Sequence, residues 1–252
     1  MSQPAFDFSE QVVVVTGGTR GVGAGTVAAF VAAGARVVTC GRHEAKVDGA
    51  LFVTADVRKP PDAERVIAKA VEEFGRLDVL VNNAGGSPQA MAAEQSPRFV
   101  EAIVGLNLLA PLWCAQSAHK VMAVQEDGGS IVNVSSVSGI RPSPGASAYG
   151  AAKAGLINLT ATLAVEWAPL VRVNCVTAGL LDTGAGDDFY GGPAGLSKVA
   201  ETVPLGRMGV PEDVAQACLF LASPAASYVS GANLVLNGGG EVPAYLTALG
   251  GM

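Results

Sequence analysis

The hydrophobic positions of this chain form short runs rich in valine and isoleucine, which alternate with longer alanine-rich stretches. The short runs are typical of buried strands, and the longer stretches have the spacing of amphipathic helices. Strands are expected near residues 12–16, 35–40, 51–54, 78–82, 130–134, 171–176 and 233–236. This alternation predicts a doubly wound α/β fold, in which a parallel sheet of about seven strands carries helices on both faces.

No linker, charge run or sequence repeat divides the chain, so residues 1–252 are expected to form one domain. One connection is unusually short. Only about ten residues separate the second expected strand from Leu51, whereas a full helical crossover needs at least ~10–12. This crossover is therefore predicted to be abbreviated, which would leave that edge of the sheet more open.

The composition of the 252 residues, 50% hydrophobic and 15% charged, favours a globular protein with a well-covered core. A net charge of −6 leaves no basic stripe to follow phosphates, so nucleic acid is not an expected partner. No uninterrupted apolar run approaches the ~20 residues of a membrane span, and the first residues lack the pattern of a secretory signal. We therefore expect no membrane partner.

The cysteines and histidines are too dispersed to predict a disulfide framework or a metal site. The four cysteines have no C-x-x-C spacing, and three of them lie in apolar runs, which is typical of reduced, buried thiols in a cytoplasmic protein. Two histidines far apart are too few for a zinc site. These residues are Cys40, Cys114, Cys175, Cys218, His43 and His119.

Tyr149 and Lys153 place a phenol and an ammonium group four positions apart within a helical pattern. The pattern continues to Trp167 and ends before Pro169, which predicts a helix about five turns long with both side chains on one face. A neighbouring cation stabilises a phenolate, whose ordinary pKa is ~10. The structural alternative is a packing tyrosine beside a solvated lysine, because so short a pattern also arises by chance. The rest of the sequence is needed to choose between the catalytic and the structural interpretation of this pair.

Glycines dominate the segment that follows the first expected strand. Residues 16–23 read Thr-Gly-Gly-Thr-Arg-Gly-Val-Gly and lead directly into a helix. Spaced glycines at this place let the backbone approach a diphosphate, which the helix N-terminus stabilises through its free N–H groups and its dipole. A merely structural turn is the alternative, but the order of strand, glycine turn and helix favours a nucleotide site of the Rossmann type.

Further segments complete a specific set of motifs. They are Asn82-Asn83-Ala84-Gly85, Ser135-Ser136-Val137-Ser138-Gly139, Asn107, Arg172-Val173-Asn174 before Gly179 and Thr183, and Pro204-Leu205-Gly206-Arg207 before Pro211-Glu212-Asp213. With the glycine turn and the tyrosine–lysine pair, they resemble the classical short-chain dehydrogenase/reductase family over residues 10–240. The resemblance implies an NAD(P)-dependent oxidoreductase that interconverts a secondary alcohol and a ketone.

The resemblance also implies roles for the residues of the catalytic set. Tyr149 would pass a proton to or from the substrate oxygen while the nicotinamide gives or takes a hydride. Lys153 would lower the pKa of the Tyr149 phenol and bind the nicotinamide ribose. Asn107 would hold a water that links Lys153 to solvent, and its structural alternative is a helix-interior amide that bridges backbone groups.

A serine completes the implied catalytic set. Ser136, thirteen positions before Tyr149, would hydrogen-bond the substrate oxygen and stabilise its developing charge. Ser135 and Ser138 compete for this role, and the spacing favours Ser136.

The charge at the end of the second strand bears on the choice of cofactor. NAD-binding folds usually carry an acidic residue about 20 positions past the glycine turn, where it binds the ribose hydroxyls. Here that place is Gly41, followed by Arg42, and Arg20 lies in the glycine turn. Two guanidinium groups there would clamp a ribose phosphate. NADP(H) is thus predicted over NAD(H), which stays possible because both arginines could simply be solvated.

By the same resemblance, more residues line the cofactor. Asp56 would lie near the adenine amine and Asn83 to Gly85 beside it, although a turn-forming aspartate and a tight strand end are the structural alternatives. The full expected cofactor set is Gly17, Thr19, Arg20, Gly21, Val22, Gly23, Arg42, Asp56, Val57, Asn83, Ala84, Gly85, Tyr149, Lys153 and Thr183.

The family places a mobile substrate lid near residues 182–203 of this chain. The glycine content of this segment fits a gating loop. Its residues Asp187, Asp188, Phe189 and Tyr190 offer no evident anion-binding group, and the two aromatic ones either pack the lid or contact substrate. Residues 88–91, 137–143 and 242–252, the last within a C-terminal tail 241–252, are expected to add the remaining walls.

Two other functions stay open. One subgroup of the family reduces 3-oxoacyl groups on an acidic carrier protein, which needs basic residues at the mouth of the site. At the turns after two of the long helices, this chain has Gln125-Glu126-Asp127 and Ala168-Pro169-Leu170 in place of basic residues. An acidic carrier would be repelled there, so we rank carrier-bound reduction below reaction with a free small-molecule carbonyl or alcohol substrate. A non-catalytic dinucleotide-binding sensor is the second alternative, but it would have no chemical need of the catalytic set.

The resemblance also implies a homotetramer. The long helices that carry Asn107 and Tyr149 would pack across one two-fold axis. Residues 234–236 and the C-terminal tail would pack across another.

Overall fold

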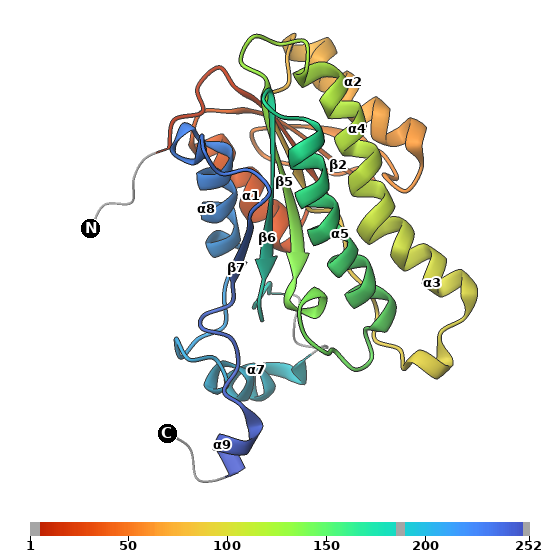
Figure 1. Ribbon diagram of the computed structural model, residues 1–252, viewed down its shortest axis with the longest axis vertical. Helices are drawn as coiled ribbons and strands as arrows, with labels where there is room; N and C mark the ends of the chain where they lie inside the picture. The colour runs from red at the N-terminus through yellow and green to blue at the C-terminus, as the bar shows by residue number, and fades with distance from the viewer. Residues whose placement is uncertain (1–5, 185–189, 249–252) are drawn as a thin grey trace.

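The computed structural model describes residues 6–184 and 190–248, which form one Rossmann-type domain (Figure 1). The strands are β1 Val12–Thr16, β2 Arg36–Gly41, β3 Ala50–Thr54, β4 Val79–Asn82, β5 Gly129–Ser136, β6 Val171–Ala178 and β7 Asn233–Leu236. The helices are α1 Gly21–Ala32, α2 Pro60–Phe74, α3 Pro97–Val104, α4 Ala110–Met122, α5 Ser147–Glu166, α7 Gly192–Glu201, α8 Pro211–Ala222 and α9 Ala244–Ala248.

The strands form a single parallel sheet in the order β3-β2-β1-β4-β5-β6-β7. All seven predicted strands are confirmed, with ends that differ from the expected ones by no more than two residues. The chain order reverses between β1 and β4. In open parallel sheets, ligands bind at the carboxyl ends of the strands beside such a reversal, so the fold alone directs attention to the ends of β1 and β4.

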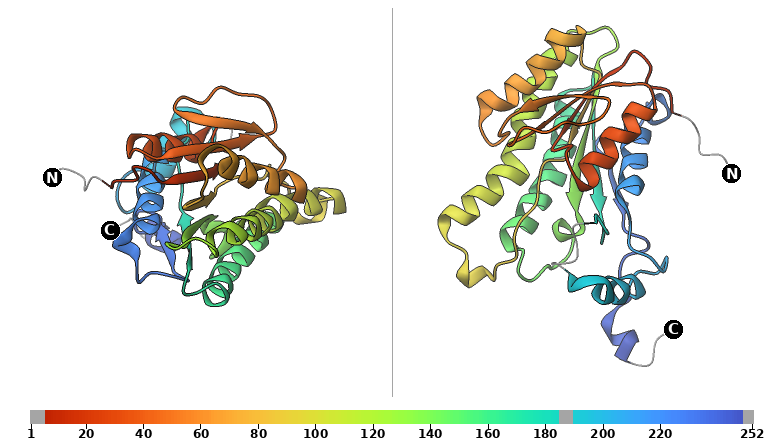
Figure 2. Two further views of the ribbon diagram at one scale, coloured as in Figure 1. Left: turned by 90° about the horizontal axis from the view of Figure 1, so that it is seen from above. Right: turned by 180° about the vertical axis from the view of Figure 1, so that it is seen from behind.

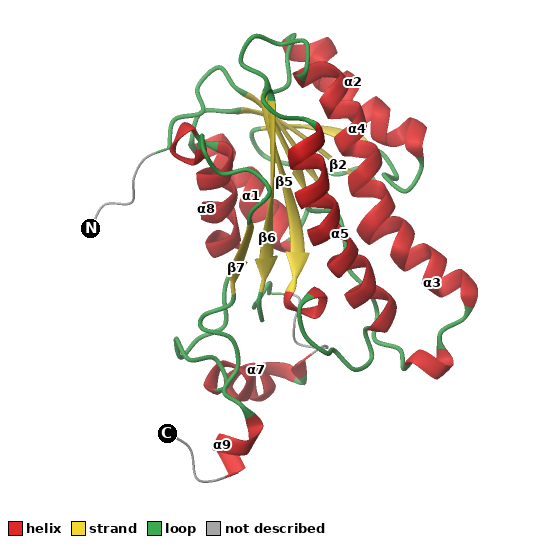
Figure 3. Ribbon diagram, in the orientation of Figure 1, coloured by secondary structure: helices red, strands yellow, loops and turns green. Residues whose placement is uncertain are grey.

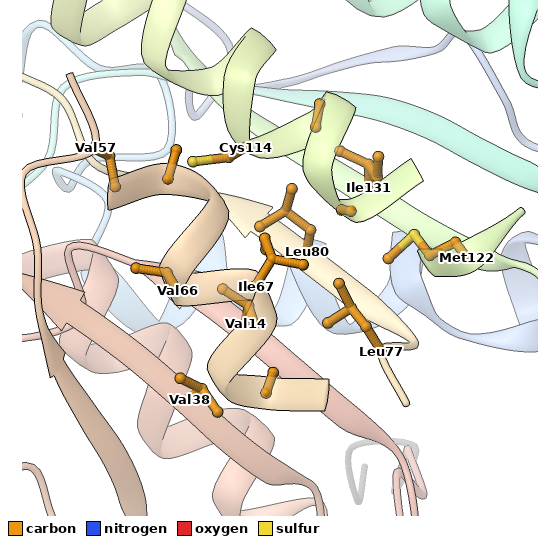
Figure 4. Close-up of a cluster of buried hydrophobic side chains, with 14 of the residues drawn as sticks. Val14, Val38, Val57, Val66, Ile67, Leu77, Leu80, Cys114, Met122 and Ile131 are labelled. Carbon is orange, nitrogen blue, oxygen red and sulfur yellow. The ribbon is translucent and has the colours of Figure 1, made fainter. Parts of the chain in front are cut away.

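Helices cover both faces of the sheet (Figures 1 and 2). Along β1, Val12 and Val14 face a core closed by α2, α4 and α5, while Val13 and Val15 face a core closed by α1 and α8. Figure 4 shows the first core, with Val14, Val38, Leu80 and Ile131 of the sheet against Val66 and Ile67 of α2 and Cys114 and Met122 of α4. A strand buried on both faces has to be apolar throughout, which accounts for the uninterrupted valine runs.

The connection from β2 to β3 contains no helix, and all its residues, 42–49, belong to the described part of the chain. This confirms the predicted abbreviated crossover. β3 is the outermost strand on one side of the sheet, and it pairs with β2.

One helical run within the described ranges, Pro97–Met122, has the length and mean hydropathy (1.4) of a membrane span. It consists of α3, a π turn Gly105–Leu109 and α4. The run contacts α2, α5, β4 and β5, and helices that pack on a sheet core have the same composition. Packing therefore accounts for part of its apolar character, since 33% of its most apolar 18-residue stretch is buried.

Below the carboxyl ends of β5, β6 and β7 lie the short turn Val137–Gly139, α7 and α9 (Figure 3). The 20-residue α5 confirms the predicted helix, and it starts at Ser147, so Tyr149 and Lys153 lie in its first two turns. α7 and α9 come from the expected lid and tail. Asp187, Asp188 and Phe189 of the expected lid lie outside the described residues.

Candidate active site

The glycine turn after β1 is closely packed. Gly17 has φ +71°, and a Cβ on Gly23 would lie 2.1 Å from the Gly17 carbonyl oxygen. A Cβ on Gly18 would lie 2.2 Å from Thr39 Oγ1, which accepts a hydrogen bond from the Gly18 N–H at 3.0 Å. Arg20 is the N-cap residue of α1, and its side chain accepts no hydrogen bond from the first backbone N–H groups of this described helix. The turn thus brings bare backbone and a helix N-terminus to the switch point, as the sequence predicted.

The end of β4 is tied to the end of β1 by backbone and side-chain hydrogen bonds. Thr16 Oγ1 accepts from the N–H groups of Asn83 and Ala84, both at 3.0 Å. The Asn83 amide donates in return to the Thr16 carbonyl at 2.9 Å. These bonds place Asn83, Ala84 and Gly85 beside the glycine turn, where a Cβ on Gly17 would be 3.1 Å from Ala84 Cα.

Lys153 is 3% exposed, and its Nζ donates to the Val134 carbonyl of β5 at 2.7 Å. The same Nζ lies 5.7 Å from the centre of the Tyr149 ring. Burial lowers the pKa of the Lys153 ammonium to about 8. The structure therefore brings the pair together and rules out the solvated lysine of the structural alternative.

Ser136 ends β5 next to Tyr149. Burial raises the pKa of the Tyr149 phenol above its ordinary value, and a hydrogen bond with the Ser136 side chain opposes this. The competing Ser135 is turned away, because its hydroxyl donates to the Lys153 carbonyl at 3.0 Å. Ser138 contributes its backbone N–H to Ser136 Oγ at 3.2 Å. Of the three serines, Ser136 is the one whose side chain is hydrogen-bonded with Tyr149.

The pKa of Tyr149 differs from the sequence-based expectation. We expected Lys153 to lower it, yet in the chain alone burial raises it. The Lys153 Nζ donates to the Val134 carbonyl, and burial disfavours its charged form. The pKa of the Tyr149 phenol is therefore raised by burial rather than lowered by Lys153.

Asn107 sits in the π turn and is completely buried. Its amide nitrogen donates to the Ile103 carbonyl at 2.9 Å and to the Gly86 carbonyl at 3.0 Å, and its Oδ1 accepts from the Gly86 N–H at 2.9 Å. The side chain thus bridges backbone groups, as in the structural alternative. It also borders the tyrosine–lysine pair, since a Cβ on Gly85 would lie 2.8 Å from Asn107 Oδ1 and 3.2 Å from Lys153 Nζ.

The ends of β2 and β3 carry a group of arginines. Arg20 and Arg42 are exposed, and neither forms a salt bridge with any described residue. Asp56 is held by Arg58, whose Nη2 donates to Asp56 Oδ2 at 2.6 Å. This hydrogen bond, with a smaller contribution from Arg42, lowers the pKa of the Asp56 carboxyl. The sequence analysis missed Arg58, although its position two residues after Asp56 was a usable signal.

Other predicted cofactor residues lie around the same edge. Thr183 lies against the glycine turn, since a Cβ on Gly21 would be 3.5 Å from Thr183 Cβ. Thr19 is exposed, Val22 is half-buried and Val57 is buried, all at the carboxyl ends of the strands or just beyond them. The residues of the predicted cofactor set therefore lie together at the carboxyl ends of the strands.

A cavity of about 460 Å³ lies beyond the carboxyl ends of β5, β6 and β7, and its lining begins at Val137, the residue after Ser136. Its walls are the segment 137–141 after β5, Gly179 and Leu180 after β6, and residues 237–244. The two charged residues in these walls, Arg141 and Glu241, form a salt bridge. Walls from residues 137–143 and 242–252 were predicted, whereas Gly179, Leu180, residues 237–241 and the ionic pair were not.

The acidic turn at Gln125-Glu126-Asp127 lies at the amino-terminal ends of strands β4 and β5. Gln125 hydrogen-bonds the backbone of Leu77, just before β4 begins, and Asp127 pairs with Arg76 at 3.3 Å. Tyr149 and Ser136 lie at the carboxyl ends of the strands. Our argument that this turn repels an acidic carrier from the chain's own site is therefore wrong.

A parallel sheet of this order, with a glycine turn at its switch point, is the architecture of dinucleotide-binding enzymes. Residues 17–241 match the family described as Enoyl-(Acyl carrier protein) reductase. The chain is 38% identical to 3alpha-hydroxysteroid dehydrogenase of Mediterraneibacter gnavus, over 90% of this chain and 96% of the relative. It is 34% identical to 3-oxoacyl-[acyl-carrier-protein] reductase of Synechocystis sp., over 91% and 96%.

Among solved structures, ligand-free aldohexose dehydrogenase of Thermoplasma acidophilum superposes with a TM-score of 0.88 at 31% identity, covering 94% of this chain and 96% of the other. The chain therefore belongs to the classical short-chain dehydrogenase/reductase family. It is an oxidoreductase that acts on CH–OH groups.

Proposed function

We propose that the protein interconverts a secondary alcohol and a ketone of a small free substrate, with NADP(H) as cofactor and Tyr149 as general acid and base. The observation that carries this proposal is the convergence of Tyr149, Ser136 and buried Lys153 at the end of β5, where the lining of a cavity begins with Val137. When bound, the nicotinamide supplies or accepts the hydride.

The residues of the chain fit such a cofactor. The glycine turn leaves no room for side chains where a diphosphate would approach, and the N-terminus of α1 adds its dipole. Lys153 would hold the nicotinamide ribose, and Gly17 to Gly23, Asn83 to Gly85 and Thr183 would line the rest.

The proton chemistry follows from the environment of Tyr149. Because burial raises the pKa of its phenol, the group stays protonated at neutral pH and can donate to a ketone oxygen. Ser136 would donate a second hydrogen bond to that oxygen and stabilise its charge. The Lys153 ammonium would stabilise the phenolate that is left. Asn107 would fix Gly86 and the tyrosine–lysine pair, while the water it was predicted to hold stays a prediction.

NADP(H) is the proposed cofactor because Arg20 in the glycine turn and Arg42 after β2 are exposed and form no salt bridge with a described residue, and because Gly41 replaces an acidic residue at the end of β2. Asp56 is neutralised by Arg58, so its carboxylate would repel a ribose phosphate less. NAD(H) lacks that phosphate and would gain nothing from the arginines.

We also propose a homotetramer in the cytoplasm. The outer faces of α4 and α5 border a hollow of about 690 Å³ whose lining includes Trp113, Leu159 and Trp167, and Val165 is 80% exposed. Such apolar faces fit the helix pairing expected across a two-fold axis. The four buried, unbridged cysteines fit a reducing compartment. A monomer by light scattering would contradict the assembly.

The decisive experiment follows NADPH and NADH consumption with a panel of free ketones and 3-oxoacyl thioesters. We expect turnover of a free ketone with NADPH. Preferred turnover of carrier-bound 3-oxoacyl groups would instead support the activity that one relative's name describes. No turnover of any compound despite tight NADPH binding would support a sensor.

A further inference from the structure

The cavity beyond the carboxyl ends of β5, β6 and β7 has an apolar wall and one ionic pair. Val137, Ile140 and Leu180 supply apolar surface, and Arg141 and Glu241 are the two charged residues of the described lining. Small-molecule sites typically combine an apolar lining with a few polar groups that fix the ligand's orientation. The ionic pair is thus the feature that can select among substrates.

Arg141 is held firmly at the wall of this cavity. Its backbone N–H donates to the Val137 carbonyl at 3.0 Å. Its Nη1 donates to the Pro142 carbonyl and to Ser143 Oγ, both at 3.0 Å. Since Val137 directly follows Ser136, the backbone of Arg141 keeps a fixed relation to this serine, and the bonds to Pro142 and Ser143 orient the guanidinium.

The guanidinium has unused hydrogen-bonding capacity. Its Nε is buried and finds no acceptor among the described residues. Its Nη2 donates to the Glu241 carboxylate. A buried charged donor without an acceptor is unfavourable, so an acceptor oxygen supplied by a ligand would improve this site.

The Glu241 carboxylate can leave the Arg141 guanidinium by a rotation of its side chain. The backbone beside Glu241 is fixed, since the Gly240 N–H donates to the Asn237 carbonyl at 3.0 Å and the Val242 N–H donates to the Thr202 carbonyl at 2.9 Å. The Glu241 side chain is 38% exposed, so solvent is available to the carboxylate. Its departure from the guanidinium therefore requires no change in the backbone.

Tyr190 connects the ionic pair to the reacting phenol. Burial raises the pKa of Tyr190, while Arg141 lowers it and Glu241 raises it. Tyr190 in turn contributes to the raised pKa of Tyr149. The charges of Arg141 and Glu241 therefore lie within electrostatic range of a side chain that also faces the catalytic tyrosine.

We propose that Arg141 is a specificity-determining residue that binds a carboxylate of the substrate, and that Glu241 occupies the same guanidinium when no substrate is bound. This inference rests on the proposed alcohol–ketone reaction and names its substrate class. The substrate is a hydroxy acid or oxo acid whose carboxylate is separated from the reacting carbon by an apolar segment. A guanidinium binds a carboxylate through two parallel hydrogen bonds, and Val137, Ile140 and Leu180 contact the apolar segment.

The test compares oxo acids of increasing chain length with their methyl esters. For the best pair, the wild type should favour the acid, and Arg141→Met should lower the acid-to-ester ratio of kcat/KM about tenfold or more. Arg141→Lys, which keeps the charge but not the planar fork, should give an intermediate ratio. Glu241→Gln should lower the KM of the acid, because it removes the competing carboxylate. Arg98→Met, which removes an exposed arginine outside the cavity, should leave the ratio unchanged.

Binding is measured separately from turnover. In the NADP⁺ complex of Tyr149→Phe, the oxo acid should raise the Tm, and the added change Arg141→Met should abolish this rise. If no compound is turned over but this pattern holds, the proposed reaction fails and the carboxylate site stands. Turnover of ketones with an acid-to-ester ratio near one, or a ratio unaffected by Arg141→Met, would overturn the carboxylate site alone.

Discussion

On the side of β1 and β4, the site is built mainly of backbone. Gly17 and Gly23 are packed too closely to accept a side chain, and Thr16 and Asn83 fix the strand ends. On the side of β5 to β7, the site is built of side chains from distant segments, and Arg141 and Glu241 lie 100 positions apart.

This difference explains what each side can do. Backbone packed this tightly accepts one shape of ligand, which suits a cofactor shared by many enzymes. Side chains on loops and on a glycine-rich tail change with few consequences for the fold, which suits a pocket that defines one substrate. The two sides meet at Lys153, which borders both Gly85 and Tyr149.

The largest expected effect concerns Lys153, where the two sides meet. Its folded-state pKa of about 8 lies below the ordinary 10.5, so the folded protein disfavours the charged form. Between these values the unfolded chain binds a proton that the folded chain lacks, and stability rises with pH. Relative to Lys153→Met, the wild type should gain roughly 3 kcal/mol in free energy of unfolding between pH 8 and pH 10.5.

Urea unfolding at several pH values measures this gain. The exposed Lys46 provides the control, and Lys46→Met should follow the wild type. Parallel stability curves for wild type and Lys153→Met would show that the lysine is not desolvated.

The next largest effect tests the backbone side. In Gly23→Ala the new Cβ would meet the Gly17 carbonyl oxygen at 2.1 Å and Asn83 Nδ2 at 2.5 Å. The turn has to move, so we expect a loss of ~2 kcal/mol in stability and a marked loss of NADPH affinity. Gly105→Ala is the matched control, because its Cβ would meet nothing within 4 Å. Calorimetry of NADPH binding that finds the two variants alike would contradict the close packing of the turn.

The smallest expected effect concerns Arg42 and tests whether the protein prefers NADPH to NADH. Arg42→Ala should weaken NADPH about tenfold, the loss expected for one charge-assisted hydrogen bond, and leave NADH nearly unchanged. Arg98→Ala removes an exposed arginine far along the sequence, on α3, and should affect neither. Equal losses for the two cofactors would mean that Arg42 does not bind the ribose phosphate.

The backbone side could be predicted from the sequence because its determinants are local. Strand, glycine turn and helix follow one another, and Tyr149 and Lys153 share one helix. The continuous valine runs likewise identified strands buried on both faces. These features depend on spacings of a few residues, which the sequence displays directly.

The substrate side could not be predicted, because its contacts join segments that are distant along the chain. Nothing near Arg141 indicates that Glu241 will reach it, and the hydrogen bonds of Asn107 depend on a π turn. The error about the acidic turn at Asp127 was avoidable. A turn that immediately precedes a parallel strand lies at its amino edge, whereas ligands bind at the carboxyl edge.

The most direct test of the account is ketone reduction by Tyr149→Phe beside the control Tyr228→Phe, with the substrate that the panel identifies. Tyr228 is fully exposed, so its variant should retain full activity. Loss of the proton donor should lower kcat of Tyr149→Phe by at least about 100-fold, while NADPH binding, followed by fluorescence, persists. Undiminished kcat in Tyr149→Phe would contradict the central claim that this phenol transfers the proton.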